Sequence, residues 1–322
     1  MKIVFTTQLP KEGFRRLKGH DLVLPDEPYM SQERLSETIV DAEVLVATFD
    51  YAVGADILSH ADRLRLVANF GVGFNNIDVA YCVGRGIMVT NTPHTVTEPT
   101  AEHCFALMHT LAHRTAELDR KLRAKDPSIV FGVMNNLGVS LYGKQLGIIG
   151  MGRIGQSVAR RALASGMHIV YHNRHRLDAE TETALQATYM TQDELLRTSD
   201  YVSLNLPYTP EVHHLIDRGA LSRMKPTAFL INTARGAHVD EGALVEALKG
   251  KIIAGAALDV FEHEPDISEE LLGMDNVVLS PHVGTGTIDG RLDMCRNVED
   301  NILFFLAGEM EKMNLVKVIR VS

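Results

Sequence analysis

Cysteines are few in this sequence, and long apolar runs are missing. Cys82, Cys104 and Cys295 are odd in number, far apart and without the paired spacing of metal ligands, so we expect neither a disulfide framework nor a metal site. No stretch approaches the roughly 20 consecutive apolar residues of a membrane helix, and Met1 leads into a strand-like run over 2–7 instead of a signal peptide. The sequence therefore predicts a soluble, cytoplasmic protein with no membrane partner.

Positive charge is also in short supply. Lysine and arginine number 32 against 41 aspartate and glutamate residues, which gives a formal net charge of −9. This balance opposes nonspecific attraction to nucleic acid or to anionic lipid, although a local basic pocket for a small anion is compatible with it. We expect no nucleic-acid partner.

Short apolar runs alternate with helical segments along most of the chain, which predicts parallel sheets covered by helices. A length of 322 residues with 45% hydrophobic content favours two domains over one. The fold class is therefore α/β, with two doubly wound parallel sheets. We expect strands of the first sheet at 3–5, 44–46, 66–68 and 87–89, and strands of the second sheet at 146–149, 168–171, 201–204, 228–231, 253–258 and 277–279.

The domain boundaries follow from two long helical segments. Residues 100–123 contain no proline or glycine and predict one long helix that connects the domains. Residues 288–306 are again helical and come after the second sheet is complete, so this helix can return to the first domain. The expected domains are 1–98 with 288–322, and 99–287.

Gly150, Gly152 and Gly155 form a GxGxxG turn between an apolar strand and a helix. Gly150 permits the tight turn, Gly152 lets the backbone approach a pyrophosphate, and Gly155 lets the helix lie close to the strand. The N–H groups that open the helix favour an anion. A plain glycine loop is the alternative, but the strand before the turn and the helix after it favour dinucleotide binding.

The next strand ends at Asn173, where an NAD-binding fold usually places a carboxylate on the ribose hydroxyls. Asn173 lacks the charge that would repel a 2'-phosphate, and the nearby Arg174 and Arg176 can bind one. The sequence thus favours NADPH over NADH. Alternatively, both arginines are ordinary surface charges.

Three further motifs follow the glycine turn: LINTARG at 230–236, ALDVFEHEP at 257–265 and LSPHVG at 279–284. Together with the turn, they resemble the D-isomer-specific 2-hydroxyacid dehydrogenase family in order and spacing over nearly the whole chain. The Tyr-His-Asn-Arg sequence at 171–174 is most similar to the glyoxylate and hydroxypyruvate reductases of that family. The resemblance implies a Rossmann-type cofactor domain, a flavodoxin-like substrate domain, a cleft between them, and reduction of a small 2-oxo acid to the D-2-hydroxy acid with NAD(P)H.

The resemblance also implies that Arg235, Glu264 and His282 form the catalytic set, and their chemistry suits the reaction. The planar fork of Arg235 can bind the carboxylate and ketone oxygens of a 2-oxo acid. His282 can donate the proton that the new alkoxide needs, and Glu264 can hold the imidazole in place. Taken singly, each residue has a structural alternative: a surface arginine, a capping glutamate, or a packed or exposed histidine.

Other site residues are carried over from the same family. The loop after the strand at 66–68 resembles a carboxylate-binding loop in which the amides of Val72 and Gly73 grip the substrate, as an anion nest does. That loop's glycines could instead serve conformation alone, and Asp259 could be an ordinary strand-end carboxylate. The expected cofactor-binding residues are Val72, Gly150, Gly152, Arg153, Ile154, Gly155, Asn173, Arg174, Arg176, Leu206, Pro207, Thr233, Ala234, Arg235, Asp259, His282 and Gly284.

The sequence departs from some of its relatives at two positions. Family members often carry a tryptophan in the loop before the glycine turn, and this chain has none, so Phe131 or Met134 would fill that space. The chain also lacks the arginine near Phe49 that phosphoglycerate-specific relatives share, which makes a phosphorylated substrate less favoured. We expect a homodimer formed through the cofactor domain.

Several other functions fit parts of the same pattern. A dinucleotide-sensing corepressor resembles this family in fold and residues, and dehydrogenases of D-lactate or 2-ketogluconate share its chemistry. Formate dehydrogenases would carry glutamine where this chain has Glu264.

Overall fold

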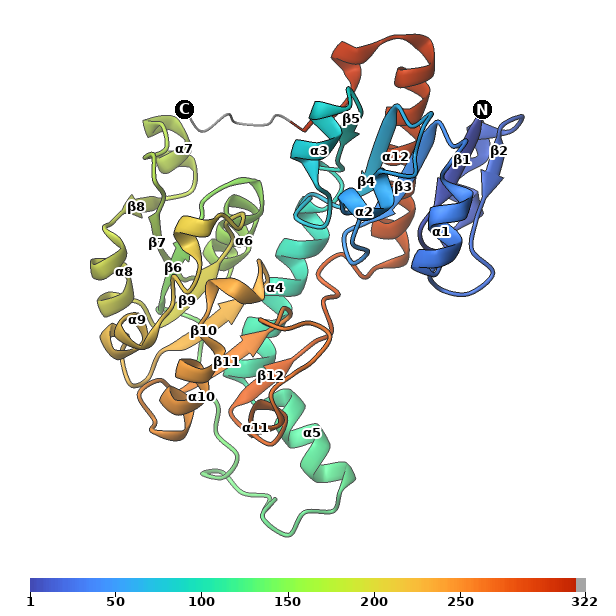
Figure 1. The fold of residues 1–322 in the computed structure, drawn as a ribbon. Coiled ribbons are helices and arrows are strands. Elements are labelled where there is room, and N and C mark those ends of the chain that lie inside the picture. Colours follow the sequence, from blue (N-terminus) through green and yellow to red (C-terminus); the bar gives the residue numbers. More distant parts are fainter. Residues whose placement is uncertain (317–322) are drawn as a thin grey trace. The chain divides into compact units, whose positions relative to one another are not determined.

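Two parallel sheets organise the chain, one in each of two units (Figure 1). Unit 1 consists of Met1–Val96 and the chain from Thr285 onward, and unit 2 is Thr97–Gly284. The computed structural model describes residues 1–316. Every strand pair in both sheets is parallel, and helices lie between successive strands, which confirms the predicted α/β class.

Unit 1 contains a five-stranded sheet in the order β2-β1-β3-β4-β5. Its strands are β1 (Lys2–Phe5), β2 (Asp21–Val23), β3 (Val44–Thr48), β4 (Leu66–Phe70) and β5 (Met88–Thr90). Its helices are η1 (Lys11–Leu17), α1 (Gln32–Thr38), α2 (Ala55–Leu58), α3 (Val79–Gly84), α12 (Ile288–Ala307) and η4 (Met310–Lys312), where η marks a 3-10 helix.

An apolar core lies on each face of this sheet, because apolar side chains point alternately to the two faces along the strands. Ile3 and Phe5 belong to one apolar cluster and Val4 to the other, because successive strand side chains point to opposite faces. On the Ile3 face, η1 approaches α12 so closely that a Cβ on Gly13 would lie 2.2 Å from the Cβ of Cys295. The C-terminal helix α12 is therefore an integral part of unit 1.

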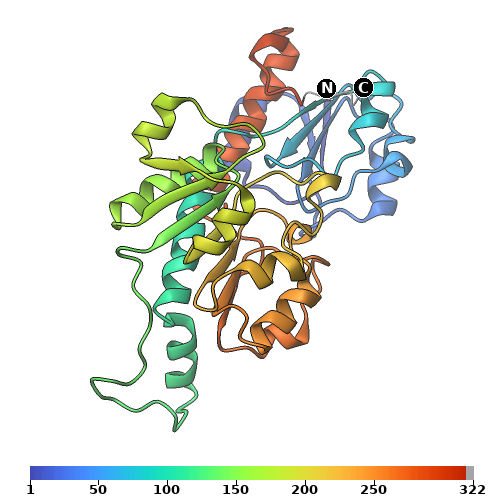
Figure 2. The same ribbon diagram turned by 90° about the vertical axis from the view of Figure 1, so that its left-hand side faces the viewer.

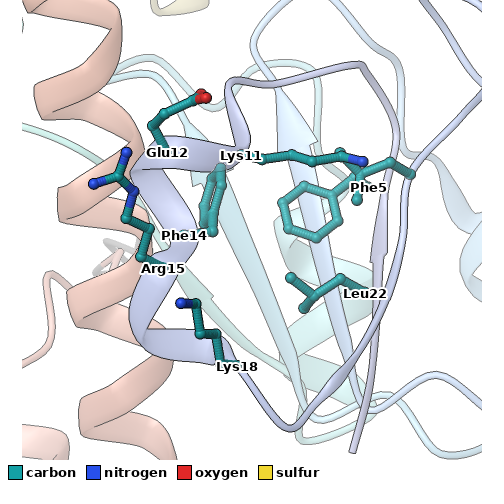
Figure 3. Close-up of a pocket in the computed structure, with 8 residues that line it drawn as sticks. Phe5, Lys11, Glu12, Phe14, Arg15, Lys18 and Leu22 are labelled. Atoms are coloured by element: carbon teal, nitrogen blue, oxygen red, sulfur yellow. The ribbon is translucent and has the colours of Figure 1, made fainter.

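A cavity of about 430 Å³ lies beside η1 in unit 1 (Figure 3). Phe5, Phe14 and Leu22 supply apolar walls, and the side chains of Lys11 and Lys18 border it. The rings of Phe5 and Phe14 meet edge to face with centroids 5.0 Å apart.

Unit 2 contains a seven-stranded sheet in the order β12-β11-β10-β9-β6-β7-β8. Its strands are β6 (Gln145–Ile149), β7 (His168–His172), β8 (Ala187–Tyr189), β9 (Tyr201–Leu204), β10 (Phe229–Asn232), β11 (Gly255–Leu258) and β12 (Val277–Leu279). Its helices are α4 (Thr97–Ala112), α5 (Thr115–Arg123), α6 (Arg153–Ala164), α7 (Ala179–Ala184), α8 (Gln192–Thr198), η2 (Pro210–Val212), α9 (Arg218–Arg223), η3 (Gly236–His238), α10 (Glu241–Lys249) and α11 (Glu269–Leu272).

Strand order brings the functional motifs of unit 2 together. The carboxyl ends of parallel strands lie at the same end of the sheet, and β6, β9, β10 and β11 are consecutive neighbours. The loops that follow these strands carry the glycine turn and two of the three later motifs. Ligands of open α/β sheets bind at this end.

The predicted single helix over 100–123 is wrong. The chain breaks between α4 and α5, where Arg114 adopts a left-handed φ of 57°. The carbonyl of Ala112, at the end of α4, accepts a hydrogen bond of 2.8 Å from the amide of Val139, and Arg114 pairs with Glu117 at 2.7 Å. The amide of Val139, 27 residues further along the chain, thus binds the carbonyl that a continuous helix would have used.

The segment between α5 and β6 forms a long arm with no regular helix or strand in it (Figure 2). Several of its apolar side chains are exposed, including Phe131 at 89%, Val133 at 92% and Met134 at 77%. In the described part of the chain, no helix has the length and apolar character needed to cross a membrane.

Candidate active site

The glycine turn joins β6 to α6, and at two of its glycines a Cβ atom would collide with the backbone. Gly150 has a φ of +97°, and a Cβ there would lie 2.7 Å from the backbone carbonyl of Asn205. A Cβ on Gly155 would lie 2.3 Å from the carbonyl oxygen of Gly150. Gly152, by contrast, has no heavy atom within 4 Å of its Cβ position, so open space adjoins the start of α6.

This open space fits the pyrophosphate of a dinucleotide. Gly152 is the N-cap of the 12-residue α6 and offers no side chain to its first amides, so the N–H groups around Arg153 and Ile154 can bind an anion. Leu206 and Pro207 follow β9, and Thr233 and Ala234 follow β10.

Buried polar atoms at the same end of the sheet support the fit. Asn205 Oδ1 and Thr233 Oγ1 are two of several side-chain atoms that are buried without a hydrogen-bond partner in residues 1–316. Native structures leave few such atoms unpaired, so their position at the ends of β9 and β10 suits a polar ligand. Residues at this end of the sheet can therefore hold a dinucleotide.

The strand β7 delivers Asn173 to the turn. Its side-chain oxygen accepts a hydrogen bond of 2.6 Å from the amide of Met151. Arg176 instead forms an ion pair with Glu182 and donates to both of its carboxylate oxygens at 2.8 Å. The hydrogen bonds from Arg176 and Tyr171 lower the pKa of Glu182 to about 2. Arg174 is exposed, and in residues 1–316 it forms no ion pair. Of the two predicted cations, Arg174 is the one with no carboxylate at ion-pair distance among the described residues, although the charge of Glu211 is near enough to interact with it.

Glu264 and His282 form a hydrogen-bonded pair. The Nδ1 atom of His282 lies 2.7 Å from Glu264 Oε2, and Glu264 Oε1 accepts from the amide of Phe261 at 2.9 Å. Their side chains are 35% and 29% exposed, so the pair is accessible to a small ligand. Burial raises the pKa of Glu264, but the bonds from His282 and Phe261 outweigh it, and the net pKa lies below its ordinary value. Glu264 is therefore a carboxylate at neutral pH.

Arg235 lies three residues after the end of β10 in the same unit. Its Nη1 donates 2.6 Å to the carbonyl of Ala234, and within the described residues its guanidinium has no ion-pair partner. Burial lowers the pKa of Arg235, and the nearby charge of Glu264 offsets part of this shift. The group stays a cation at neutral pH, with most of its donors left for a ligand.

Asp259 fixes the loop that carries His282. This carboxylate is 1% exposed and accepts hydrogen bonds from the amides of Val283 and Gly284 at 2.9 and 2.8 Å and from Ser280 Oγ at 2.6 Å. Burial raises the pKa of Asp259, but these bonds and one from His103 outweigh it, so the net pKa is lowered.

The backbone of His282 is held in an unusual conformation. His282 has a left-handed φ of 52°, and its amide donates 2.8 Å to the carbonyl of Asp259. Non-glycine residues rarely adopt such a φ and tend to do so at functional sites. His103 and Ser280 support Asp259, and the sequence did not assign either role. His103 lies outside every motif, and Ser280 belongs to the 279–284 motif but has no chemistry of its own in the reaction.

In unit 1, Val72 and Gly73 lie on the loop after β4. Asn69 Nδ2 donates to the carbonyl of Gly73 at 2.7 Å, and Asn91 Nδ2 donates to the carbonyl of Val72 at 2.9 Å. Within residues 1–316, the amides of Val72 and Gly73 donate no hydrogen bond. Side-chain amides thus fix the carbonyls and leave two N–H groups for a ligand.

Comparison with known proteins extends these observations. Residues 105–284 match the sequence model of the D-isomer specific 2-hydroxyacid dehydrogenase, NAD binding domain. The glyoxylate reductase of Thermococcus onnurineus is 42% identical over 314 residues, which cover 96% of this chain and 94% of that protein.

Two solved structures of other dehydrogenases and reductases superpose closely on this chain. The NADPH-dependent glyoxylate/hydroxypyruvate reductase of Sinorhizobium meliloti superposes with a TM-score of 0.85 at 30% identity, over 99% of this chain and 97% of the other. The D-lactate dehydrogenase of Aquifex aeolicus, in complex with NAD and lactic acid, superposes with a TM-score of 0.83 at 30% identity, over 98% and 99%. This chain therefore belongs to the D-isomer-specific 2-hydroxyacid dehydrogenase family and is an NAD(P)-dependent oxidoreductase.

Proposed function

We propose that this enzyme reduces a small 2-oxo acid with NADPH to the 2-hydroxy acid: glyoxylate to the achiral glycolate, or hydroxypyruvate to the D-2-hydroxy acid. The observation that carries this proposal is the hydrogen-bonded pair of Glu264 and His282 in the unit that also presents Arg235. A carboxylate-oriented imidazole and an arginine with open donors are the groups that a 2-oxo acid requires. The similarity to glyoxylate reductases supports the choice of substrate.

Each catalytic residue has a distinct task in this proposal. A bound nicotinamide dinucleotide supplies the hydride that adds to the ketone carbon. Arg235 orients the substrate through its carboxylate and ketone oxygens and stabilises the charge that develops on the ketone oxygen. His282 then gives the Nε2 proton to this oxygen, and Glu264 stabilises the imidazolium at Nδ1 beforehand. Val72 and Gly73 bind the substrate carboxylate through their amides.

The cofactor-binding residues keep the roles that the sequence predicts. The turn from Gly150 to Gly155 holds the pyrophosphate, Asn173 and Arg174 face the adenosine ribose, and Asp259 fixes the loop against the nicotinamide. The remaining contacts come from Arg153, Ile154, Arg176, Leu206, Pro207, Thr233, Ala234 and Gly284.

The preference for NADPH can be tested with two arginine variants. Arg174→Ala should lose most of the preference, measured as the ratio of kcat/KM for NADPH to kcat/KM for NADH. Arg176→Ala is the matched control, and its effect should be smaller because Glu182 already engages Arg176. A wild-type enzyme that clearly prefers NADH would refute the proposal.

A homodimer formed through unit 2 is the second part of the proposal. The exposed apolar residues of the arm, among them Phe131 and Met134, form the kind of surface that protein partners cover. Light scattering should report twice the chain mass for the wild type and a shift to monomer for the Phe131→Ser, Met134→Ser double variant. Ile288→Ser, which removes an equally exposed side chain from unit 1, should stay dimeric. Monomeric wild-type protein would contradict this part.

One alternative has a specific observation in its favour. The similarity to a D-lactate dehydrogenase that binds NAD and lactic acid makes pyruvate a second candidate substrate. The test is the rate of NADPH and NADH oxidation with glyoxylate, hydroxypyruvate, pyruvate and 2-ketogluconate. Highest kcat/KM with pyruvate would favour this alternative, and turnover on none would favour the corepressor-like function. A cytoplasmic location and the lack of nucleic-acid partners stay predictions of the sequence.

A further inference from the structure

We propose that unit 2 contains a binding site for a divalent transition metal of the Zn²⁺ type, formed by His213, His214 and Glu262. Each of these residues offers one ligand atom, and the three atoms lie within 4.8 Å of one another. His213 is exposed, and the other two are half-buried, so a metal can reach the cluster from solvent. None of the three belongs to the proposed catalytic set.

The two histidines are neighbours in sequence, yet their rings lie side by side. Successive side chains of an extended chain point in opposite directions, which would separate them. His214 instead adopts a left-handed φ of 50°, and the rings of His213 and His214 stack with centroids 3.9 Å apart and planes 21° apart. The Nε2 atom of His214 lies 2.5 Å from Glu262 Oε1. This backbone conformation therefore brings both imidazoles to one carboxylate.

The scaffold around the cluster holds its two segments in place. The amide of His214 donates 2.9 Å to the carbonyl of Ala237 in η3, and the amide of Ile216 donates 2.9 Å to the carbonyl of His238. On the other side, Glu262 and Glu241 exchange backbone-to-carboxylate hydrogen bonds of 3.2 and 3.3 Å. Anchored ligands lose little conformational entropy when a metal binds, which favours affinity.

The ligand set selects the class of metal. Two imidazoles and one carboxylate are a known zinc set, with a fourth position left for water. Nitrogen ligands favour Zn²⁺, Co²⁺, Ni²⁺ and Cu²⁺ over Mg²⁺ and Ca²⁺, which prefer oxygen. Bonds of about 2.0–2.2 Å to a tetrahedral metal require ligand atoms roughly 3.5 Å apart. The lone pairs of imidazole nitrogens lie in the ring plane, so the stacked rings of His213 and His214 must unstack before both can point at one metal. The exposed His213 would rotate and give up the 3.4 Å contact of its Nδ1 with the hydroxyl of Tyr208, and the contact between His214 and Glu262 must open as the metal replaces the shared proton.

A bound metal would connect two segments that lead to the catalytic residues. The segment of His213 and His214 pairs with η3, which begins directly after Arg235, and Glu262 precedes Glu264 by two positions. Because the metal binds the folded state, it should also stabilise unit 2 by mass action.

The test uses tag-free enzyme stripped with EDTA and titrated with Co²⁺ alone. We expect one equivalent of Co²⁺ to produce a ligand-field absorption band in the visible region, with the same stoichiometry by calorimetry. His213→Ala should weaken the affinity by more than about tenfold, whereas His168→Ala, which removes another exposed histidine of unit 2, should leave it unchanged. Mg²⁺ should not compete.

Two results would overturn the proposal: no band at one equivalent, or equal Co²⁺ affinity in the wild type and His213→Ala. Because His213 is exposed, its variant should melt at the wild-type temperature in EDTA, and Zn²⁺ should raise the melting temperature of the wild type only. These readouts do not depend on the substrate or cofactor of the enzyme.

Discussion

His238 should make the folded enzyme sensitive to mild acid. Its side chain is 0% exposed, and neither ring nitrogen makes a hydrogen bond of ordinary geometry with the described residues. Burial lowers the pKa of His238 from 6.5 to about 4, and the positive charge of nearby Arg235 acts in the same direction. The folded state therefore keeps the ring neutral at a pH where the unfolded chain already binds a proton.

The sign and size of the effect follow from proton linkage. A base with a depressed pKa contributes its full stability above pH 6.5, and this contribution is lost as the pH falls from 6.5 towards 4. With these two pKa values, the free energy of unfolding should drop by about 2 kcal/mol between pH 7 and pH 5, and by about 3 kcal/mol at pH 4. Losses of this size are a large share of the stability of most domains.

Urea unfolding at pH 7 and pH 5, followed by circular dichroism, measures this difference. His238→Leu has a similar volume and cannot titrate, so the drop between the two pH values should shrink by about 2 kcal/mol. His168→Leu makes the same chemical change at an exposed position of unit 2 and should keep the wild-type drop. If His238→Leu loses as much stability at pH 5 as the wild type, the reasoning is refuted.

Three further predictions concern the turn, the loop and the substrate. Gly150→Ala should destabilise the protein by about 2 kcal/mol in urea titrations and weaken NADPH binding, while Gly84→Ala, where a Cβ meets nothing within 4 Å, should do neither. Asp259→Ala should lower the free energy of unfolding by about 3 kcal/mol, because it leaves the amides of Val283 and Gly284 without a hydrogen-bond acceptor. Asp259→Asn should recover part of this loss, and equal stability of the two variants would contradict the account. Arg235→Lys keeps the charge but loses the planar fork, so the KM for the 2-oxo acid should rise by about tenfold or more while the Kd for NADPH changes little. Equal changes in both constants would argue against a role in substrate binding.

The strands of both sheets were largely predictable, because their apolar runs have a clear length and spacing. The exceptions are β2 and β8, which have three residues each and lie at sheet edges. The apolar run of β2 is only Leu22, Val23 and Leu24 and ends at Pro25, and in β8 the exposed Thr188 separates Ala187 from Tyr189. Short edge strands of this kind are formed by their neighbours rather than by their own composition.

Residues of the candidate site were predictable where a motif carried them. The glycine turn and the pair of Glu264 and His282 belong to this class. The ion pair between Arg176 and Glu182 was not predictable, because Glu182 lies six positions away on α7 and only the folded loop brings the two residues together. The support of Asp259 by His103, from a distant helix, was equally hidden.

The central claim is that His282, oriented by Glu264, protonates a 2-oxo acid during reduction by NADPH. The most direct measurement compares wild type and His282→Ala, following NADPH absorbance with glyoxylate and hydroxypyruvate and measuring NADPH binding by fluorescence. We predict turnover by the wild type with a D-configured product from hydroxypyruvate, and near-complete loss of turnover with unchanged NADPH affinity in the variant. Near-normal rates in His282→Ala, or no turnover of any 2-oxo acid by the wild type, would contradict the account.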